Sequence, residues 1–435
     1  MGSEGAVLAV ALVALLALGA PISVAIGVAA AVSLCAAIPA APALATVAQQ
    51  IATGLDSFAL LAIPLFILSG HLMNRGGAAR RLIDLGKELV GALPGGLVWV
   101  EVLGCVLFGA ISGSAVATAA AVGGVMAPRM EQDGYGRDFG AALSVAAATT
   151  GLLIPPSNVL IVYSLASGGV SVAALFFAGY VPGLLIALLV GVTAVGLAAR
   201  RGRLPRARGF AMGRLGKSAA AALPSLLLVV VVMGGIVAGI FTATEAAGIA
   251  VLYALVLALA VHRELRPREL PRVLVEAAAT TGVVLLLIGA SMALAWTMAY
   301  AGIPQAVARL LLDAAAGPVA LLLALNLLLL AIGTFLDMTP AVLLFTPMFL
   351  PAAVELGIDP VHLGIVMTLN LCIGISTPPV GTLLFVACGV SGTTLGRVVP
   401  YLAPLYAALL LALAVVTAVP ELSLALPRAL GLLGD

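Results

Sequence analysis

Two stretches of sequence decide the fold: LIPPSN at residues 153–158 and its counterpart ISTPPVGT at residues 375–382. Both place consecutive prolines inside otherwise apolar segments. Consecutive prolines lack two backbone N–H donors and cannot continue the helix that precedes them. Each stretch therefore predicts a helix that stops and then resumes. Carbonyl groups left at such a break need protein, water or a cation as partners, because an unpaired group in hydrocarbon costs several kcal/mol.

The two proline pairs belong to an internal duplication. Pro155 and Pro156 recur 223 positions later as Pro378 and Pro379. The same offset relates other residues that shape turns and sites, namely Pro128 with Pro351, Gly134 with Gly357, and Ser114 with Asp337. So many correspondences at a single offset indicate a repeat.

Composition places this duplication in a membrane. Hydrophobic residues make up 63% of the 435 residues and charged residues 9%, whereas a soluble domain is about 45–50% apolar. Apolar stretches close to the ~20 residues needed to cross a bilayer recur along the whole chain. A soluble fold is therefore excluded.

A short helical hairpin is expected before each break. Helix 97–111 would span about 22 Å, less than the ~30 Å hydrocarbon core. It ends at Ser112-Gly113-Ser114, and a second short helix follows at 115–126. In the second repeat the corresponding turn is Leu336-Asp337-Met338-Thr339-Pro340. Each hairpin is expected to enter the membrane, turn near its middle and leave on the side where it entered.

Basic residues predict the orientation. All 20 Lys and Arg except Arg309 and Arg428 lie in segments that can share one side of the membrane. These segments are 75–91, 129–138, 200–217, 263–272 and the position Arg397. The positive-inside rule places that side in the cytoplasm. The two hairpins then enter from opposite sides, so the duplication is an inverted repeat.

The rest of the chain predicts further spans and connections. Spans are expected at about 5–20, 22–38, 57–73, 179–199, 224–241, 245–262, 273–299 and 402–419. We expect a Pro/Ala-rich connection after residue 38, an interfacial amphipathic segment at 75–91 and a basic loop at 200–217. Thr242 or Thr244 is expected to cap a helix with Glu245 in its first turn.

The chemistry of the breaks points to cation and anion binding. Helix C-terminal ends suit Na⁺, and helix N-terminal ends suit a carboxylate. Neutral oxygen ligands are available from Ser112, Ser114, Ser157, Thr339, Thr377 and Thr382. Asp337 is the only acid expected near the membrane midplane, and it either binds an ion or a proton or caps its helix. No Lys or Arg is expected there, which favours Na⁺ coupling and leaves proton coupling through Asp337 open.

Other polar residues have simpler interpretations. Asn158 either caps the resumed helix or faces a ligand. Glu101 and Glu276 are expected near cytoplasmic helix ends, snorkelling or paired, and His71 is expected in a solvated or interfacial position. No HExxH, Ser/His pair or mid-membrane acid pair is visible in the sequence, so an enzyme is not expected.

At this point the sequence resembles a known family, the large membrane subunit of the tripartite ATP-independent periplasmic (TRAP) transporters, over essentially its whole length. The stretches that carry the resemblance are SGSAVATAAAVGGVMAP at 112–128, GLLIPPSNVLIVY at 151–163, GVSVAALFFAGYVPGLL at 169–185, GIFTATEAAGIAVLYAL at 239–255, DMTPAVLLFTPMFLP at 337–351 and GIDPVHLGIVMTLNLCIGISTPPVGTLLFVACGV at 357–390.

The resemblance implies an all-α integral membrane fold of the elevator type, with two re-entrant helical hairpins and two discontinuous helices. We expect transport-domain repeats at 95–170 and 319–392. Scaffold and arm helices are expected at 1–94, 171–318 and 393–435.

Family Na⁺ sites lie where a hairpin tip meets the broken-helix loop of the same repeat. By resemblance these sites fall on Ser112, Gly113, Ser114, Pro155, Pro156 and Asn158, and on Asp337, Met338, Thr339, Thr377, Pro379 and Gly381. Substrate contacts are expected from Ser114, Thr118, Ser157, Asn158, Thr339 and Thr382. The first tip reads Ser-Gly-Ser where many members have consecutive serines, so the hydroxyl that binds the ion stays open.

The implied function is Na⁺-driven import of small organic acids, such as dicarboxylates or sialic acid, across a bacterial or archaeal cytoplasmic (inner) membrane. The implied partners are a small four-helix membrane subunit and a soluble extracytoplasmic substrate-binding protein, both separate polypeptides. No nucleic-acid partner is expected. The alternative is a stand-alone Na⁺- or H⁺-coupled anion transporter of the same superfamily that needs no binding protein.

Overall fold

The structure, a computed structural model, describes residues 3–202, 212–314, 317–378 and 381–433. Within these ranges every regular element is a helix. Among the described residues, seven helices are long and apolar enough to cross a membrane. A bent pair, 137–153 with 158–166, makes an eighth if it is counted as one span. The predicted all-α membrane class is confirmed.

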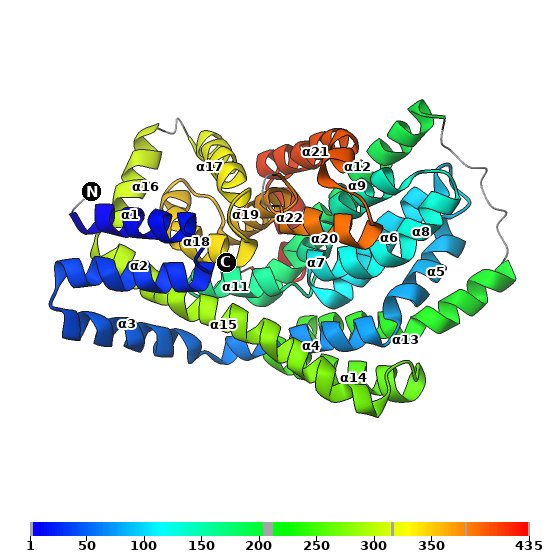
Figure 1. Ribbon diagram of the computed structural model, residues 1–435, viewed down its shortest axis with the longest axis horizontal. Helices are drawn as coiled ribbons and strands as arrows, with labels where there is room; N and C mark the ends of the chain where they lie inside the picture. The colour runs from blue at the N-terminus through cyan, green and yellow to red at the C-terminus, as the bar shows by residue number, and fades with distance from the viewer. Residues whose placement is uncertain (1–2, 203–211, 315–316, 379–380, 434–435) are drawn as a thin grey trace.

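The chain opens with helices that reach one end of the long axis (Figure 1). They are α1 (Ser3–Ala17), α2 (Ile22–Ala37) and α3 (Ala40–Leu55), followed by the 3₁₀ turn η1 (Phe58–Leu61) and α4 (Ala62–Arg75). Helix α3 corrects the expected Pro/Ala-rich connection after residue 38. Pro39 precedes this helix and Pro42 lies in its first turn, where a missing N–H leaves no intrahelical bond unmade.

The first hairpin follows an amphipathic helix, α5 (Ala78–Val90), which packs against it. The hairpin comprises α6 (Gly96–Ser112), α7 (Ala115–Thr118), the π-helical turn η2 (Ala119–Gly123) and α8 (Gly124–Gln132). Its turn falls at Gly113, whose φ of 60° lies in the left-handed region that favours glycine. The predicted tip is therefore confirmed, although the second leg continues to Gln132 instead of 126.

The first broken helix follows, and it bends by 50° at the predicted double proline. It consists of α9 (Arg137–Ala148), α10 (Thr150–Leu153) and α11 (Asn158–Ala166). The peptide bond between Pro155 and Pro156 is cis.

Long helices separate the two repeats. They are α12 (Val172–Arg200), α13 (Met212–Val237), α14 (Ala243–Val256) with the π-helical turn η3 (Leu257–Val261), η4 (Pro267–Glu269), α15 (Leu270–Tyr300) and α16 (Ile303–Ala314). The expected basic loop at 200–217 is already helical from Met212. Thr242 caps α14 in a reciprocal capping box with Glu245, as predicted.

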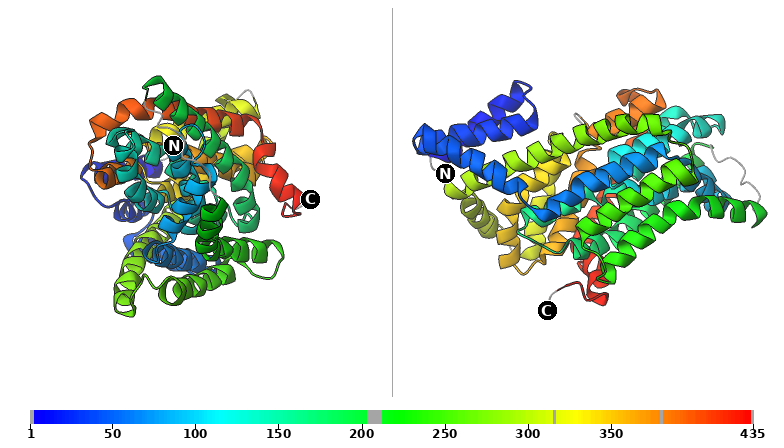
Figure 2. Two further views of the ribbon diagram at one scale, coloured as in Figure 1. Left: turned by 90° about the vertical axis from the view of Figure 1, so that its right-hand side faces the viewer. Right: turned by 90° about the horizontal axis from the view of Figure 1, so that it is seen from below.

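Helix α15 runs along the molecule beside α4 and contacts α2, α3 and α18 as well (Figure 2). It therefore connects the N-terminal helices to the second hairpin. Its length and these contacts suit a scaffold element, although the division into scaffold and transport domains stays a prediction.

The second repeat has the same sequence of elements as the first. The hairpin is α17 (Pro318–Gly333) and α18 (Met338–Glu355), and the broken helix is α19 (Pro360–Gly374) and α20 (Thr382–Ser391). Two helices end the chain, α21 (Leu395–Ala418) and α22 (Glu421–Ala429), of which α22 was not expected.

A glycine contact holds hairpin and broken helix together in both repeats. A Cβ atom on Gly109 would lie 2.3 Å from the Cα atom of Gly151. In the second repeat a Cβ atom on Gly374 would lie 2.6 Å from the Cα atom of Gly333. Gly151 and Gly374 are related by the 223-residue offset, whereas Gly109 and Gly333 are 224 residues apart. The duplication in sequence therefore corresponds to a duplicated backbone contact, which only glycine permits at such short distances.

Candidate functional site

A cavity of about 270 Å³ brings the two hairpin tips together against helices α4 and α15. From the repeats it is lined by Ser112–Ala117, Leu152, Asn158, Val159, Val162, Asp337–Thr339 and Ile375. The opposite wall consists of Ile63, Ile67, Gly70, His71, Asn74, Thr280 and Val284. Predicted residues of both repeats thus share one cavity.

The first tip is a small network of hydroxyl groups. Ser114 caps α7 by accepting a hydrogen bond from the backbone N–H of Ala117 at 3.3 Å. The hydroxyl of Thr118 donates to the carbonyl of Ser114 at 2.8 Å and lies 3.1 Å from the hydroxyl of Ser112. Ser112 and Ser114 line the cavity, whereas Thr118 is buried beneath them. The structure therefore places Thr118 as a support for the tip.

The first tip rests on the first break. A Cβ atom on Gly113 would lie 2.4 Å from the carbonyl oxygen of Pro156. Beside this contact, the hydroxyl of Ser157 and the side-chain oxygen Oδ1 of Asn158 are buried without a hydrogen-bond partner among the described residues. Buried polar atoms are nearly always paired in native proteins. These two oxygens therefore mark a place where an ion, a water molecule or a ligand can bind.

The alternatives for Asn158 can now be compared. Ser157 occupies the N-cap position of α11, and Asn158 is the first residue of the helix. Asn158 also lines the cavity. Its position favours a ligand contact over a capping role.

The second tip places a carboxylate at the cavity. Asp337 occupies the N-cap position of α18 but makes no side-chain capping hydrogen bond. It is exposed although it lies deep between the helices, because it lines the cavity together with Met338 and Thr339. The geometry therefore favours ion or proton binding over capping.

The second break is more completely paired than the first. The hydroxyls of Ser376 and Thr377 both donate to the carbonyl of Ile373 at 2.7 Å. The carbonyl of Ser376 accepts a hydrogen bond from the hydroxyl of Tyr406 on α21, and the carbonyl of Ile375 accepts one from the N–H of Leu383. Among the described residues of this break, the hydroxyls of Ser376 and Thr377 and the carbonyls of Ile375 and Ser376 are therefore already paired within the protein.

The other predicted site residues have separate positions. Gly381 and Thr382 surround a second cavity of about 10 Å³ together with Asp337. Pro155 and Pro156 are buried and do not line the main cavity. Pro379 lies outside the described residues.

The sequence missed the polar residues of the opposite wall. His71 and Asn74 of α4 and Thr280 of α15 line the cavity. His71 is half-buried in this wall, four residues before the end of α4, and its expected solvated or interfacial position stays a prediction. A signal was present, because His71 and Asn74 are spaced three residues apart in an apolar helix and so share one face.

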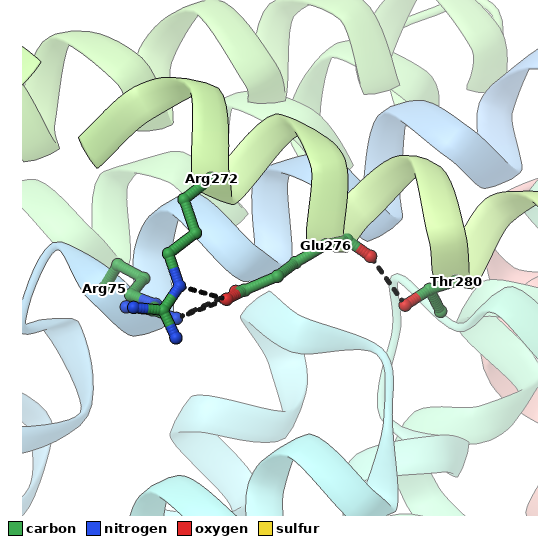
Figure 3. A network of polar contacts seen from close by, with 4 residues as sticks. All are labelled: Arg75, Arg272, Glu276 and Thr280. Carbon is green, nitrogen blue, oxygen red and sulfur yellow. Dashed lines mark hydrogen bonds and ion pairs between the residues drawn. The ribbon is translucent and has the colours of Figure 1, made fainter. Parts of the chain in front are cut away.

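Glu276 and Glu101, both expected to snorkel or to be paired, have different environments in the structure. Glu276 is paired, as one of its two interpretations expected: Arg75 contacts it at 2.8 Å and Arg272 at 3.1 Å (Figure 3). Glu101 does not snorkel. It is buried, and the hydroxyl of Ser144 donates to one of its carboxylate oxygens.

Comparison with known proteins gives this cavity its context. Residues 9–422 match the family described as "Tripartite ATP-independent periplasmic transporter, DctM component". The chain belongs to this family. It is similar to an uncharacterized protein of Salmonella typhimurium named YgiK, with 49% identity over 95% of this chain and 94% of that one. It is also similar to the C4-dicarboxylate TRAP transporter large permease protein DctM of Pseudomonas aeruginosa, with 44% identity over 87% of this chain and 88% of that one.

A solved structure supports the fold of this DctM-family chain. The YdaH transporter of Alcanivorax borkumensis superposes with a TM-score of 0.63 at 16% identity, covering 87% of this chain and 88% of that one. The match to the family model confirms the predicted family, and the chain is a multi-pass membrane protein of a transport family.

Proposed function

We propose that the chain is the large transmembrane subunit of a Na⁺-coupled importer of small organic acids, working by an elevator mechanism. The observation that carries this proposal is the single cavity shared by both hairpin tips, the first break and the two long helices α4 and α15. An elevator moves such tips past a fixed wall, and the cavity lies between the tips and the two helices that we propose form this wall.

Helix ends at the cavity support an anionic substrate. The N-terminal ends of α7, α11 and α18 meet there, at Ala115, Asn158 and Met338. Each end carries partial positive charge and N–H groups that have no acceptor within the helix, and such ends favour carboxylates. Ser114 and Thr339 add hydroxyl groups beside two of these ends.

Oxygen atoms at the same place support sodium as the coupled ion. The Asp337 carboxylate and the unpartnered oxygens of Ser157 and Asn158 are ligands of the kind that Na⁺ prefers. A bound cation would also offset the charge of an entering acid, which links the binding of one to the binding of the other.

The family supports our proposal for the substrate class and for the partners. The relative from Pseudomonas aeruginosa is named for C4-dicarboxylates, and we propose a small carboxylate of this class or a sialic acid. A small four-helix membrane subunit and an extracytoplasmic binding protein would complete the system, in a bacterial or archaeal cytoplasmic membrane.

The structure also supports an inward-facing arrangement. Asn74 lies in the last turn of α4, next to Arg75 and the charged helix α5, and His71 lies one turn before Arg75. The charge distribution predicts that this end of α4 faces the cytoplasm. We therefore propose that the cavity lies on the cytoplasmic side of the route that the substrate takes.

Reconstitution tests the proposal. The chain and its small subunit are placed in liposomes, and uptake of radiolabelled succinate and N-acetylneuraminate is measured with and without the binding protein and external Na⁺. We expect uptake of one acid that requires both additions. Undiminished uptake on a proton gradient alone would refute sodium coupling, and robust uptake without the binding protein would favour the stand-alone alternative.

A further inference from the structure

A cluster of charges joins α4 to α15 near the cavity (Figure 3). The Nη2 atom of Arg75 lies 2.8 Å from both carboxylate oxygens of Glu276. The Nε atom of Arg272, one turn earlier on α15, lies 3.1 Å from the same carboxylate. Two guanidinium groups therefore share one carboxylate, and the cluster has an excess of one positive charge.

The cluster adjoins the wall of the cavity. Asn74, next to Arg75, and His71, one turn before it, both line the cavity. On the other helix Thr280 lines the cavity, and its hydroxyl donates to the carbonyl of Glu276 at 3.0 Å. Both helices thus run from the cavity wall directly into the charged cluster.

Arg75 is suited to bind a second carboxylate. Its side chain is 40% exposed, so a solute leaving the cavity can reach it. A guanidinium group can bind a carboxylate through several N–H donors. In the structure the Nη2 atom of Arg75 contacts both oxygens of the Glu276 carboxylate, so Arg75 already binds a carboxylate here. Because Arg272 also contacts Glu276, that carboxylate keeps a partner when Arg75 leaves it.

We propose that Arg75 binds the carboxylate of the substrate as it leaves the cavity toward the cytoplasm, in exchange for Glu276. Arg75 supplies the cation that the hairpin tips lack, and only on the cytoplasmic side. Glu276 competes for Arg75 and so releases the acid. This inference rests on the proposed import of an organic acid.

The test separates binding on the two sides of the membrane. Proteoliposomes containing the complex are loaded with graded concentrations of the acid that the wild type takes up, and the binding protein is added outside only, so that correctly oriented transporters are measured. The readout is the internal acid concentration that halves the initial rate of uptake.

The two substitutions are expected to act in opposite directions. Arg75→Gln should raise that internal concentration about tenfold, because a charge-assisted contact is lost. Glu276→Gln should lower it about threefold, because Arg75 is freed from its competitor. The external half-saturating concentration should stay unchanged in both variants.

A remote ion pair provides the matched control. Arg428 contacts Glu421 on α22 at 2.8 Å, and neither residue lines the cavity. Arg428→Gln should leave the internal concentration unchanged. Equal shifts in the same direction for Arg75→Gln and Glu276→Gln would show that the pair only joins α4 to α15, and unchanged values would equally overturn the proposal. A wild-type complex that takes up none of the acids would instead contradict the proposed function.

Discussion

The two repeats share a backbone plan but differ in the chemistry at their tips. Both turn a hairpin beside a broken helix and hold the two together through a glycine contact. The first tip is neutral, and the break below it contains the unpartnered oxygens of Ser157 and Asn158. The second tip contributes the Asp337 carboxylate, whereas the hydroxyls of Ser376 and Thr377 in its break are bonded within the protein.

This difference shows how the two copies of a duplicated structure can take complementary roles. A duplicated fold places two similar tips at one cavity, and substitution at equivalent positions then makes one charged and the other neutral. Ser114 and Asp337 are such a pair, 223 residues apart. We infer that the second repeat supplies the charge that binds the ion and the first supplies neutral groups for ion and acid.

The largest effect is expected at Asp337. Asp337→Ser makes the second tip resemble the first and should lower Na⁺-dependent uptake about 100-fold, equivalent to ~2.7 kcal/mol for a lost charged ligand. Initial rates in proteoliposomes measure this. Asp56→Asn, an exposed acid at the end of α3, serves as the control and should leave uptake unchanged. Equal losses in both variants would contradict the assignment of the charge to the second tip.

The next effect concerns the contact between tip and break. Gly113→Ala forces a left-handed residue to carry a Cβ atom 2.4 Å from the Pro156 carbonyl, and we expect a loss of stability of more than about 2 kcal/mol. Gly381→Ala meets the Thr377 carbonyl only at 3.0 Å and should cost less.

The control for this pair is Gly134→Ala. Gly134 also has a positive φ but has open space around its Cβ position. Its substitution therefore measures only the cost of a left-handed backbone at alanine, about 1 kcal/mol. The melting temperatures of the purified variants show the order of their losses in stability. A Gly113→Ala variant as stable as Gly134→Ala would show that the first tip does not rest on its break.

A smaller effect should separate the hydroxyls of the two breaks. Ser157→Ala removes a buried oxygen that has no hydrogen-bond partner in the described part of the chain, and the half-saturating Na⁺ or acid concentration should rise about fivefold. Thr377→Val removes a hydroxyl already bonded to Ile373, and the same concentrations should change less than about twofold. The concentration dependence of uptake measures both, and the reverse order would assign the ligands to the second break.

The smallest effect is expected at the contact that completes the second break. Tyr406→Phe removes the hydrogen bond to the Ser376 carbonyl and should cost about 1 kcal/mol of stability. Tyr253→Phe removes a comparable bond, to the Pro224 carbonyl at 2.8 Å, remote from the cavity. Both variants should melt at similarly reduced temperatures, but only Tyr406→Phe should alter the Na⁺ dependence of uptake. Identical Na⁺ dependence of uptake in the two variants would show that the Tyr406 hydrogen bond does not contribute to ion binding.

The sequence predicts the breaks and the tips because proline and glycine act locally. Pro155, Pro156 and Gly113 restrict their own backbone wherever they occur. Helix α3 was missed because its prolines were interpreted as breakers, although the first turn of a helix tolerates them. The cavity wall was missed for another reason: only tertiary packing brings His71 and Thr280, 209 residues apart in the sequence, against the tips.

A structure of the complex with bound Na⁺ and acid tests the central claim most directly. We predict density for the acid in the cavity between Ser114, Asn158 and Thr339, with an ion against Asp337 or Ser157. Cryo-electron microscopy at a resolution that shows side chains can decide this. Acid bound away from the two hairpin tips, or an ion site that contains none of these residues, would contradict the account.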